Sequence, residues 1–195
     1  MRPIDTIIME VQSETPLIKT LRLDRSLDPH PGQYAMVWIR GLDEVPMSFS
    51  GPDTITVQSV GEASEALNSL GEGRSIGLRG PLGKGFTLLG ERILIIGGGV
   101  GTAPLAFLGE QAMNAGMEVT SLIGYRCCSD MIFLKRFQRL GRTIVTTDDG
   151  SSGIRGRVAA GLEALDLDDY DQIYLCGPEL MMWDVISRSR EHAKK

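Results

Sequence analysis

With 195 residues, of which 42% are hydrophobic and 23% charged, the chain is long enough for two small folded domains and has no compositional sign of disorder. Its net charge of -5, with scattered Lys and Arg, argues against a nucleic-acid partner, because phosphate backbones are bound by clustered basic side chains. Since no apolar run approaches the ~20 residues of a membrane span and the N-terminus lacks a signal-peptide core, we expect a soluble cytoplasmic protein.

The sequence up to about residue 90 consists of short runs rich in β-branched and aromatic residues, separated by Gly, Pro and Asp. Several short strands at such spacing are typical of a small antiparallel barrel or sandwich. One helix is expected to interrupt them, at about residues 62–70. The strands are predicted at residues 7–11, 18–23, 34–39, 54–60 and 75–78.

After Arg92 the pattern changes, because each strand-like run is followed by a helical stretch. Such alternation predicts a doubly wound parallel sheet, with the domain boundary near residues 88–91. The sequence therefore predicts two domains, at residues 1–90 and 91–195. In the second domain, strands are expected at residues 93–96, 119–123, 143–147 and 173–175, and helices at residues 102–115, 130–140, 158–165 and 179–192.

A glycine-rich turn follows the first strand of the second domain and leads into a helix. Glycines let the backbone approach a pyrophosphate closely, and the helix start supplies free N–H groups and the positive end of a dipole. The spacing departs from G-x-G-x-x-G, so a tight turn without a ligand is the alternative. The predicted nucleotide-binding residues of this turn are Gly97, Gly98, Gly99, Val100, Gly101 and Thr102, the last through its hydroxyl.

The three cysteines give no disulfide framework, because their number is odd and Cys127 and Cys128 are adjacent. No C-x-x-C spacing occurs, and no cysteine follows Cys176. The sequence therefore predicts no metal site and no [2Fe-2S] cluster on this chain. Cys127 and Cys128 are interpreted as incidental, with a position near the nucleotide ribose as the alternative.

Six short blocks follow one another along the chain, at residues 31–34 (PGQY), 46–50 (PMSFS), 80–86 (GPLGKGF), 97–105 (GGGVGTAPL), 147–151 (TDDGS) and 176–182 (CGPELMM). In this order they resemble the ferredoxin-NADP reductase superfamily, and within it the electron-transfer subunits of two-subunit, NAD-linked dihydroorotate dehydrogenases. The resemblance covers nearly the whole chain. It implies an antiparallel barrel that holds a flavin, followed by a sheet that binds the nicotinamide nucleotide. The family's usual four-cysteine segment for a [2Fe-2S] cluster does not occur after Cys176 in these residues, so we expect either a cluster-free variant or a cluster module found elsewhere.

The resemblance implies a flavin site in the first domain. The family's flavin motif, Arg-x-x-Ser or close to it, matches residues 45–48, with Val45 in place of the arginine that usually meets flavin phosphate. Ser48 then lies beside the isoalloxazine ring, where its hydroxyl can hydrogen-bond to N5. Without the resemblance, Ser48 reads as a residue of a turn. The implied flavin contacts in this region are Tyr34, Pro46, Met47 and Ser48.

Two further segments of the first domain resemble parts of the family's flavin site. Val60, Gly61 and Ser64 match a second phosphate contact at a helix start, although a helix cap alone accounts for the serine. Gly83 belongs to the loop that closes the barrel against the second domain in the family. A simple turn is the alternative for this loop.

Cys176 follows a buried run, which puts it at the carboxyl end of a predicted parallel strand, where open α/β sheets bind their ligands. In the family a cysteine here lies near the nicotinamide and flavin rings and helps to position the reacting carbon. Cys176 and Ser48 are therefore the predicted catalytic residues. A packing role is the alternative, because free cysteines are usually buried. The neighbouring Gly177, Pro178 and Met181 are predicted nucleotide contacts.

Polar residues follow the next two strands of the predicted sheet, again at the ligand edge. Arg126 follows the second strand, where an acid selects NADH and a base selects NADPH, so it argues mildly for NADPH, while the resemblance argues for NADH. We favour NADH. Asp148 and Asp149 follow the third strand and are predicted to contact the nucleotide, with turn formation as the alternative.

These residues predict an oxidoreductase subunit that uses bound FAD, with FMN second, and moves electrons between NAD(H) and a partner. The expected partner is the catalytic subunit of a dihydroorotate dehydrogenase of pyrimidine biosynthesis. A stand-alone NAD(P)H-dependent flavin or ferredoxin reductase is the first alternative. The second is a regulatory nucleotide-binding module without flavin, which the valine at position 45 motivates.

Overall fold

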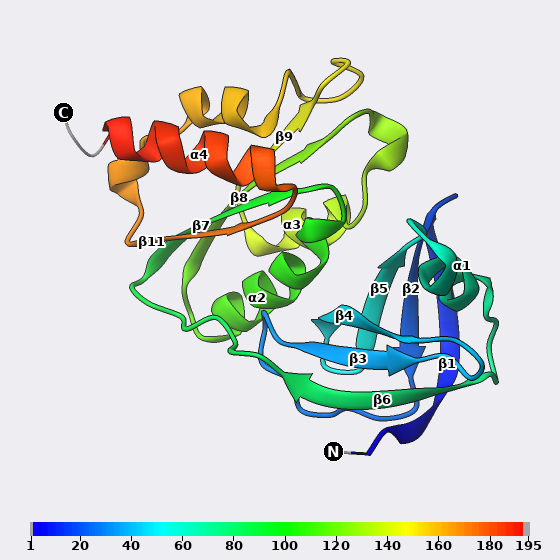
Figure 1. The fold of residues 1–195 in the computed structure, drawn as a ribbon. Coiled ribbons are helices and arrows are strands. Elements are labelled where there is room, and N and C mark those ends of the chain that lie inside the picture. The colour runs from blue at the N-terminus through cyan, green and yellow to red at the C-terminus, as the bar shows by residue number, and fades with distance from the viewer. Residues whose placement is uncertain (1, 193–195) are drawn as a thin grey trace. The chain divides into compact units, whose positions relative to one another are not determined.

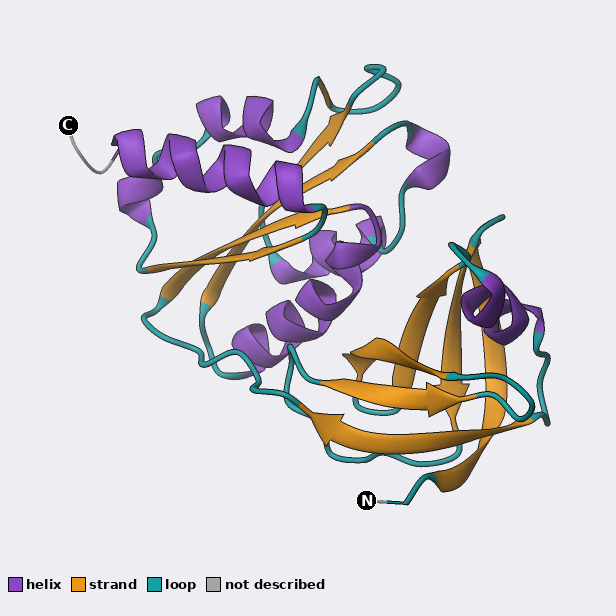
Figure 2. Ribbon diagram, in the orientation of Figure 1, coloured by secondary structure: helices purple, strands orange, loops and turns teal. Residues whose placement is uncertain are grey.

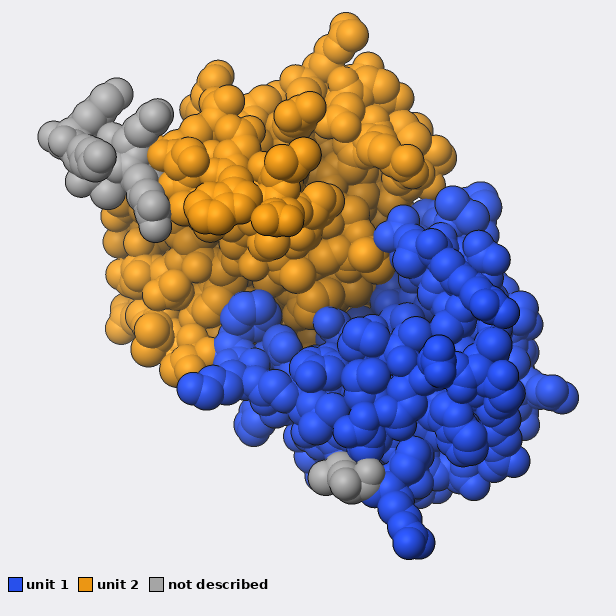
Figure 3. All heavy atoms as spheres, viewed as in Figure 1, with its two compact units in different colours: residues 1–86 blue, residues 87–195 orange. Residues whose placement is uncertain are grey.

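The computed structural model describes the backbone of residues 2–192 and the side chains of residues 2–189. The chain divides into two compact units, Met1–Phe86 and Thr87–Lys195 (Figure 3). No helix in the described part of the chain is long and apolar enough to cross a membrane.

The first unit is a closed antiparallel barrel of six strands in the order β1-β2-β5-β4-β3-β6 (Figure 1). Pairing of β1 with β6 closes it. Burial alternates along β3 and along the first residues of β1, as the period of two in a strand requires, and buried side chains of all six strands fill the barrel. The elements are β1 (Ile4–Thr15), β2 (Ile18–Leu23), β3 (Tyr34–Trp38), β4 (Glu44–Gly51), β5 (Thr54–Gln58), α1 (Glu62–Ser69) and β6 (Ser75–Leu82).

Strand β4 is absent from the strands predicted by sequence, because Pro46 stands in its middle. Proline has no N–H and is normally excluded from paired strands. In the structure the Phe49 N–H donates to the Gln33 carbonyl on the β3 side, so the nitrogen of Pro46, three residues earlier, faces the β5 side. Pairing with β5 involves only Phe49 and Gly51 of β4. The missing N–H therefore costs no ladder hydrogen bond.

The second unit is a five-stranded sheet in the order β10-β9-β8-β7-β11, with all neighbours parallel. Helices cover both faces (Figure 2): α2 and α3 lie on one, η3 and α4 on the other. The predicted fold class, a barrel followed by a doubly wound sheet, is confirmed. The elements are β7 (Arg92–Gly98), η1 (Gly99–Gly101), α2 (Thr102–Asn114), β8 (Glu118–Tyr125), η2 (Cys128–Asp130), α3 (Leu134–Leu140), β9 (Thr143–Thr147), β10 (Ile154–Arg155), η3 (Val158–Ala164), η4 (Leu167–Asp169), β11 (Gln172–Cys176) and α4 (Glu179–His192).

The helix expected at residues 158–165 is a 3-10 helix in the structure. Gly161 packs directly against Leu122 of β8, in a space that a larger side chain would overfill. Glycine also lowers the intrinsic stability of an α-helix by about 1 kcal/mol relative to alanine. Tertiary contact therefore positions this segment, and its apolar periodicity alone does not distinguish the two helix types.

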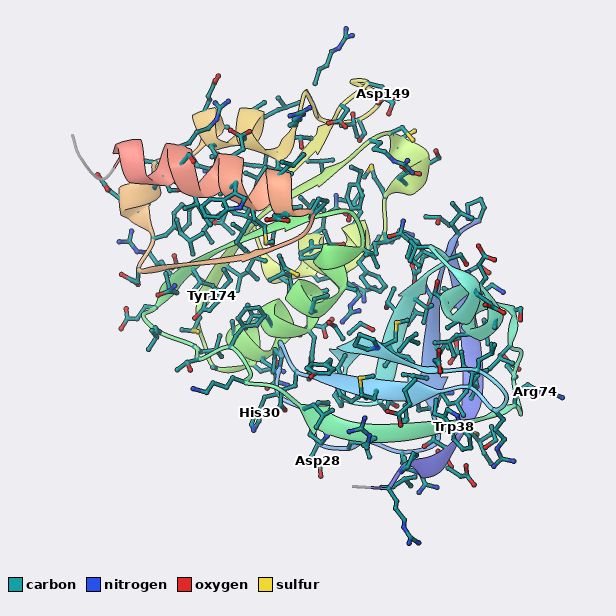
Figure 4. All side chains as sticks on the ribbon, in the orientation of Figure 1. Asp28, His30, Trp38, Arg74, Asp149 and Tyr174 are labelled. Atoms are coloured by element: carbon teal, nitrogen blue, oxygen red, sulfur yellow. The ribbon has the colours of Figure 1, made fainter. Side chains whose placement is uncertain are left out.

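Strand β11 and the residue just before it, Asp171, bind the segment that leads into β7. The Asp171 carboxylate accepts hydrogen bonds from the N–H groups of Glu91 and Arg92, both at 2.8 Å. The hydroxyl of Tyr174 donates to the Thr87 carbonyl at 2.7 Å and accepts from the Leu89 N–H at 3.1 Å (Figure 4). Residues 87–92 are thus fixed to the outermost strand of their own unit.

Replacement of Asp171 by alanine should lower the melting temperature at neutral pH by roughly 2–5 °C, because two backbone donors lose their acceptor. Hydrogen bonds from Arg92 and Glu91 lower the pKa of Asp171 in the fold. Its contribution is therefore fully present above the unfolded pKa of about 3.9 and is lost as the pH falls through the folded value. Thermal melts from pH 7 to about 3 should show a wild-type advantage that is constant down to about pH 3.9 and shrinks below that pH. Asp168→Ala, at an exposed position of η4, is the control, and equal melting of both variants would contradict the assignment.

Candidate functional site

The outer face of the barrel carries three of the residues predicted to contact flavin. Tyr34 pairs directly with Ser48, and Met36 pairs with Pro46, so these side chains share one face of the β3–β4 ladder. The residues between them on β3 are buried in the barrel, so this shared face points outward. Met47 lies opposite Ala35 and belongs to the inner face instead.

The glycine predicted at the barrel loop supports the tyrosine. A methyl group at Gly83 would lie 3.1 Å from Cε1 of Tyr34, which is closer than an ordinary contact. The glycine also has a φ of 79°, a conformation that other residues rarely adopt. The ring of Tyr34 therefore rests against bare backbone. This fixes its orientation beside the exposed hydroxyl of Ser48.

An ion pair on the same outer face was not singled out from the sequence. Arg79 pairs with Met36 across β3 and β6, and its guanidinium donates to the Glu44 carboxylate. This hydrogen bond lowers the pKa of Glu44 and raises that of Arg79. Val45 pairs with Val37 on the inner face, so the position of the family arginine points away from this charge. The pair depends on β3–β6 register, which local sequence patterns do not reveal.

The start of α1 uses the Ser64 hydroxyl internally. That hydroxyl donates to the Gly61 carbonyl at 2.8 Å and accepts from the N–H groups of Val60 at 2.9 Å and Gly61 at 3.0 Å. One donor and two acceptors exhaust the capacity of a hydroxyl. A phosphate at this helix start would therefore contact backbone N–H groups of the first turn and not the serine side chain. Val60, just before the turn, is 79% exposed.

The carboxyl edge of the sheet brings together all the residues predicted to bind nucleotide. The glycine turn after β7 lies against the turn after β11, because Gly97 pairs with Cys176. Strand β8 ends beside it, since Gly98 pairs with Gly124, and Tyr125 in turn pairs with Thr147 of β9. The edge therefore combines residues 97–102, 126–130, 147–151 and 176–181.

Two glycines of the turn have separate roles. A methyl group at Gly101 would lie 2.7 Å from Cα and N of Gly177 and 2.8 Å from the Cys176 carbonyl oxygen, so two backbone segments touch here. Gly99 has a φ of 54°, and nothing lies within 4 Å of the place a side chain would occupy. The turn thus packs tightly on one side and is open on the other, at the start of α2. Met181 contacts Gly98 and covers the base of the turn, and Pro178 lies beside the same glycine.

The Thr102 hydroxyl is buried and faces the turn itself. It donates to the Gly99 carbonyl at 2.7 Å, and the Tyr125 hydroxyl lies 3.2 Å from it. Tyr125 also donates to the Ile132 carbonyl at 2.8 Å. Thr102 therefore holds the shape of the turn, and its hydroxyl is not directed toward the open side at Gly99. The tyrosine was not identified from sequence, because its partners come from two separate loops.

The loops after β8 and β9 are joined by hydrogen bonds. The Cys128 N–H donates to the Ser151 hydroxyl at 2.8 Å, and Ser151 donates in turn to the Asp149 carboxylate from its hydroxyl at 2.6 Å and its N–H at 2.9 Å. The Ser151 hydroxyl is the main cause that lowers the pKa of Asp149. Asp149, labelled in Figure 4, thus forms a turn, as the alternative interpretation expected, while Asp148 is exposed beside it.

Cys176 lies half-buried at the end of β11, and burial raises the pKa of its thiol. It is therefore a neutral thiol at neutral pH, suited to contact and hydrogen bonding and not to nucleophilic attack. Within the part of the chain that the structure describes, no three His, Cys, Asp or Glu side chains gather so as to hold a metal ion.

Alkylation should distinguish the cysteines. Because the thiolate is the reactive form, iodoacetamide at pH 8 should modify the exposed Cys128 about tenfold faster than Cys176, a ratio that peptide mass spectrometry can follow over time. In denaturant the two rates should converge. Equal rates in the folded chain would contradict the burial of Cys176.

The closed barrel, the parallel sheet and the glycine turn at its carboxyl edge define an oxidoreductase of the ferredoxin-NADP reductase fold. Residues 95–186 match the family model described as oxidoreductase NAD-binding domain. Two solved structures have this fold at 24% identity and a TM-score of 0.85. One is an NADH-dependent reduced ferredoxin-NADP oxidoreductase, with 95% of this chain and 72% of that chain covered, and the other is the FAD/NAD binding domain of a nitric oxide dioxygenase from Vibrio cholerae, with 96% and 92% covered.

Two relatives narrow the class. The chain is 53% identical over 188 residues to a Methanocella arvoryzae protein named "Probable dihydroorotate dehydrogenase B (NAD(+)), electron transfer subunit", covering 95% of this chain and 73% of that protein. It is 38% identical over 192 residues to a Methanocaldococcus jannaschii protein of the same name, with 98% and 75% covered. The chain belongs to this family of electron transfer subunits, as the resemblance predicted.

Proposed function

We propose that this chain binds FAD on its barrel and NAD(H) on its sheet, and carries electrons between NAD(H) and the catalytic subunit of a dihydroorotate dehydrogenase. One observation carries the proposal. In a chain of this family, the glycine turn with its open Gly99 side packs directly against the turn that holds Cys176. A nucleotide bound on the first turn would reach the second.

The residues of the sheet edge fit a dinucleotide. Backbone N–H groups at the start of α2 and the open side of Gly99 suit a pyrophosphate, since no side chain fills the approach. Thr102 holds the turn from beneath, and Cys176, Gly177 and Pro178 line the neighbouring strand end. These contacts would hold the nucleotide with its nicotinamide toward the cysteine.

The residues of the barrel fit a flavin. Tyr34 offers an aromatic surface, and Ser48 offers an exposed hydroxyl beside it on the same face. The first-turn N–H groups of α1 provide a place for phosphate. We favour FAD over FMN, because the exposed Val60 next to that helix start offers an apolar surface to an adenine ring, which FAD has and FMN lacks.

When bound, the cofactors supply hydride transfer between flavin and nicotinamide, while the protein supplies binding and orientation. Ser48 would donate a hydrogen bond to the flavin ring at N5. Cys176 would remain a neutral thiol beside the nicotinamide, because a thiolate there would be poorly solvated. Neither side chain needs to gain or lose a proton for these roles.

We place no iron-sulfur cluster on these 195 residues. A [2Fe-2S] centre takes four ligands, normally thiolates, and the sequence contains three cysteines. All three are free, with Cys127 and Cys128 on the loop after β8 and Cys176 at the end of β11. A relay to the catalytic subunit would therefore use groups other than a cluster on these residues.

Reconstitution with the catalytic subunit tests the proposal. The flavin-loaded chain is mixed with a dihydroorotate dehydrogenase catalytic subunit from the same source. The mixture should reduce NAD+ with dihydroorotate, which is measured as the appearance of NADH absorbance. Neither protein alone should do so. If the chain is reduced by NADH but supports no dihydroorotate-dependent turnover, a stand-alone reductase replaces the subunit function.

A further inference from the structure

An ion pair lies at the carboxyl edge of the sheet directly after β8, where nucleotide-binding sheets of this kind commonly recognise the ribose. Arg126 follows β8 directly, and its Nε donates to Oδ2 of Asp130 at 2.8 Å. The arginine side chain is 75% exposed and that of Asp130 is 31% exposed. The carboxylate is therefore the better fixed of the two partners.

The backbone around Asp130 is held in place by the neighbouring loop. Its N–H donates to the Cys127 carbonyl at 3.1 Å, which closes the 3-10 turn η2. Cys128, the first residue of η2, donates its N–H to the hydroxyl of Ser151 in the loop after β9. The carboxylate is thus presented by a cross-linked pair of loops and not by a free surface segment.

The charges at this edge disfavour the ribose 2′-phosphate that distinguishes NADPH from NADH. Asp130, Asp148 and Asp149 carry three negative charges, against Arg126 and Arg155, whose side chain lies along Gly150. The sum, two positive and three negative charges, is -1. A ribose 2′-phosphate would bring nearly two further negative charges, and the nearest guanidinium is already paired. Ribose hydroxyls, in contrast, can donate to a carboxylate.

We propose that Asp130 sets the preference for NADH over NADPH, by neutralising Arg126 and by accepting ribose hydroxyls. This inference rests on the proposed nucleotide site. It also explains why an arginine directly after β8 does not signal NADPH in this chain. Asp130 acts on recognition of the ribose and takes no part in the hydride step.

The test uses Asp130→Asn in the full flavin-loaded chain, with dissociation constants for NADH and NADPH measured by calorimetry. Wild type should bind NADH more tightly. The variant should narrow that preference by about tenfold, mostly through tighter NADPH binding to the released guanidinium, since removal of a like charge near a phosphate is worth at least this much. Adding Arg126→Ala to the variant should abolish the gain.

Asp184→Asn is the matched control, because Asp184 forms the same i,i+4 pair with Arg188 on α4, at 3.1 Å. It should leave the ratio of the two dissociation constants unchanged. A wild-type chain that binds NADH while Asp130→Asn leaves that ratio unchanged would overturn this inference alone, as would a wild-type preference for NADPH. A wild-type chain that binds neither nucleotide would overturn the proposed function as well.

Discussion

A Gly101→Ala chain should bind NADH at least about a hundredfold more weakly than wild type. The added methyl group would lie 2.7 Å from Cα and N of Gly177, well inside van der Waals contact. Both neighbours are backbone atoms, so neither can rotate away. The glycine turn must therefore separate from the turn after β11, and a displacement of about 1 Å in a positioning element is enough for a hundredfold loss.

Calorimetry with NADH measures this loss, and flavin content checks that the barrel is intact. Gly71→Ala is the control, because Gly71 has no positive φ and nothing within 4 Å of a new methyl group. It should bind NADH as wild type does. Normal NADH affinity in Gly101→Ala would show that the contact between the two turns does not shape the nucleotide site.

Ser48→Ala should keep its flavin and be reduced by NADH about tenfold to a hundredfold more slowly. Ser48 is exposed on the outer face beside Tyr34, so its loss removes one hydrogen-bond donor without opening a cavity. A donor directed at an atom that changes charge during reaction contributes on this scale. Anaerobic stopped-flow absorbance gives the rate of flavin reduction directly.

Ser13→Ala supplies the control, since Ser13 is an exposed serine on β1 of the same barrel. Its reduction rate should match that of wild type. If Ser48→Ala also matches wild type at saturating NADH, the hydroxyl has no part in the hydride step. If it loses flavin instead, Ser48 holds the cofactor and does not tune it.

Much of the fold follows from local sequence patterns. The apolar run at residues 93–96 predicts a strand buried on both faces, and β7 has this environment between α2 and the η3–α4 layer. Strand β4 could not be predicted in the same way, because the tolerance of Pro46 depends on how short the pairing with β5 is. Strand β10 has only two residues, too few for any periodicity.

The positions of the candidate site residues were predictable, but their hydrogen bonds were not. Parallel strands align their carboxyl ends, so motifs after successive strands were expected to meet at one edge. The hydroxyls of Ser64 and Thr102 were expected to face ligand, and both are used by nearby backbone groups. Polar side chains at turns and helix starts compete for such bonds, and the sequence does not show which partner is chosen.

Arg126 illustrates the same limit for charge. Taken alone, an arginine after the second strand indicates a phosphate partner. In the structure its guanidinium is paired with Asp130, four residues later. The spacing is visible in the sequence, but only the 3-10 turn between the two residues turns it into a contact.

The most direct test is the visible absorbance spectrum of the purified chain after incubation with FAD and gel filtration, recorded before and after anaerobic addition of NADH. We expect flavin bands that stay with the protein and bleach when NADH is added. A protein that retains no flavin, or whose bound flavin is not bleached by NADH, would contradict electron transfer between the two cofactors.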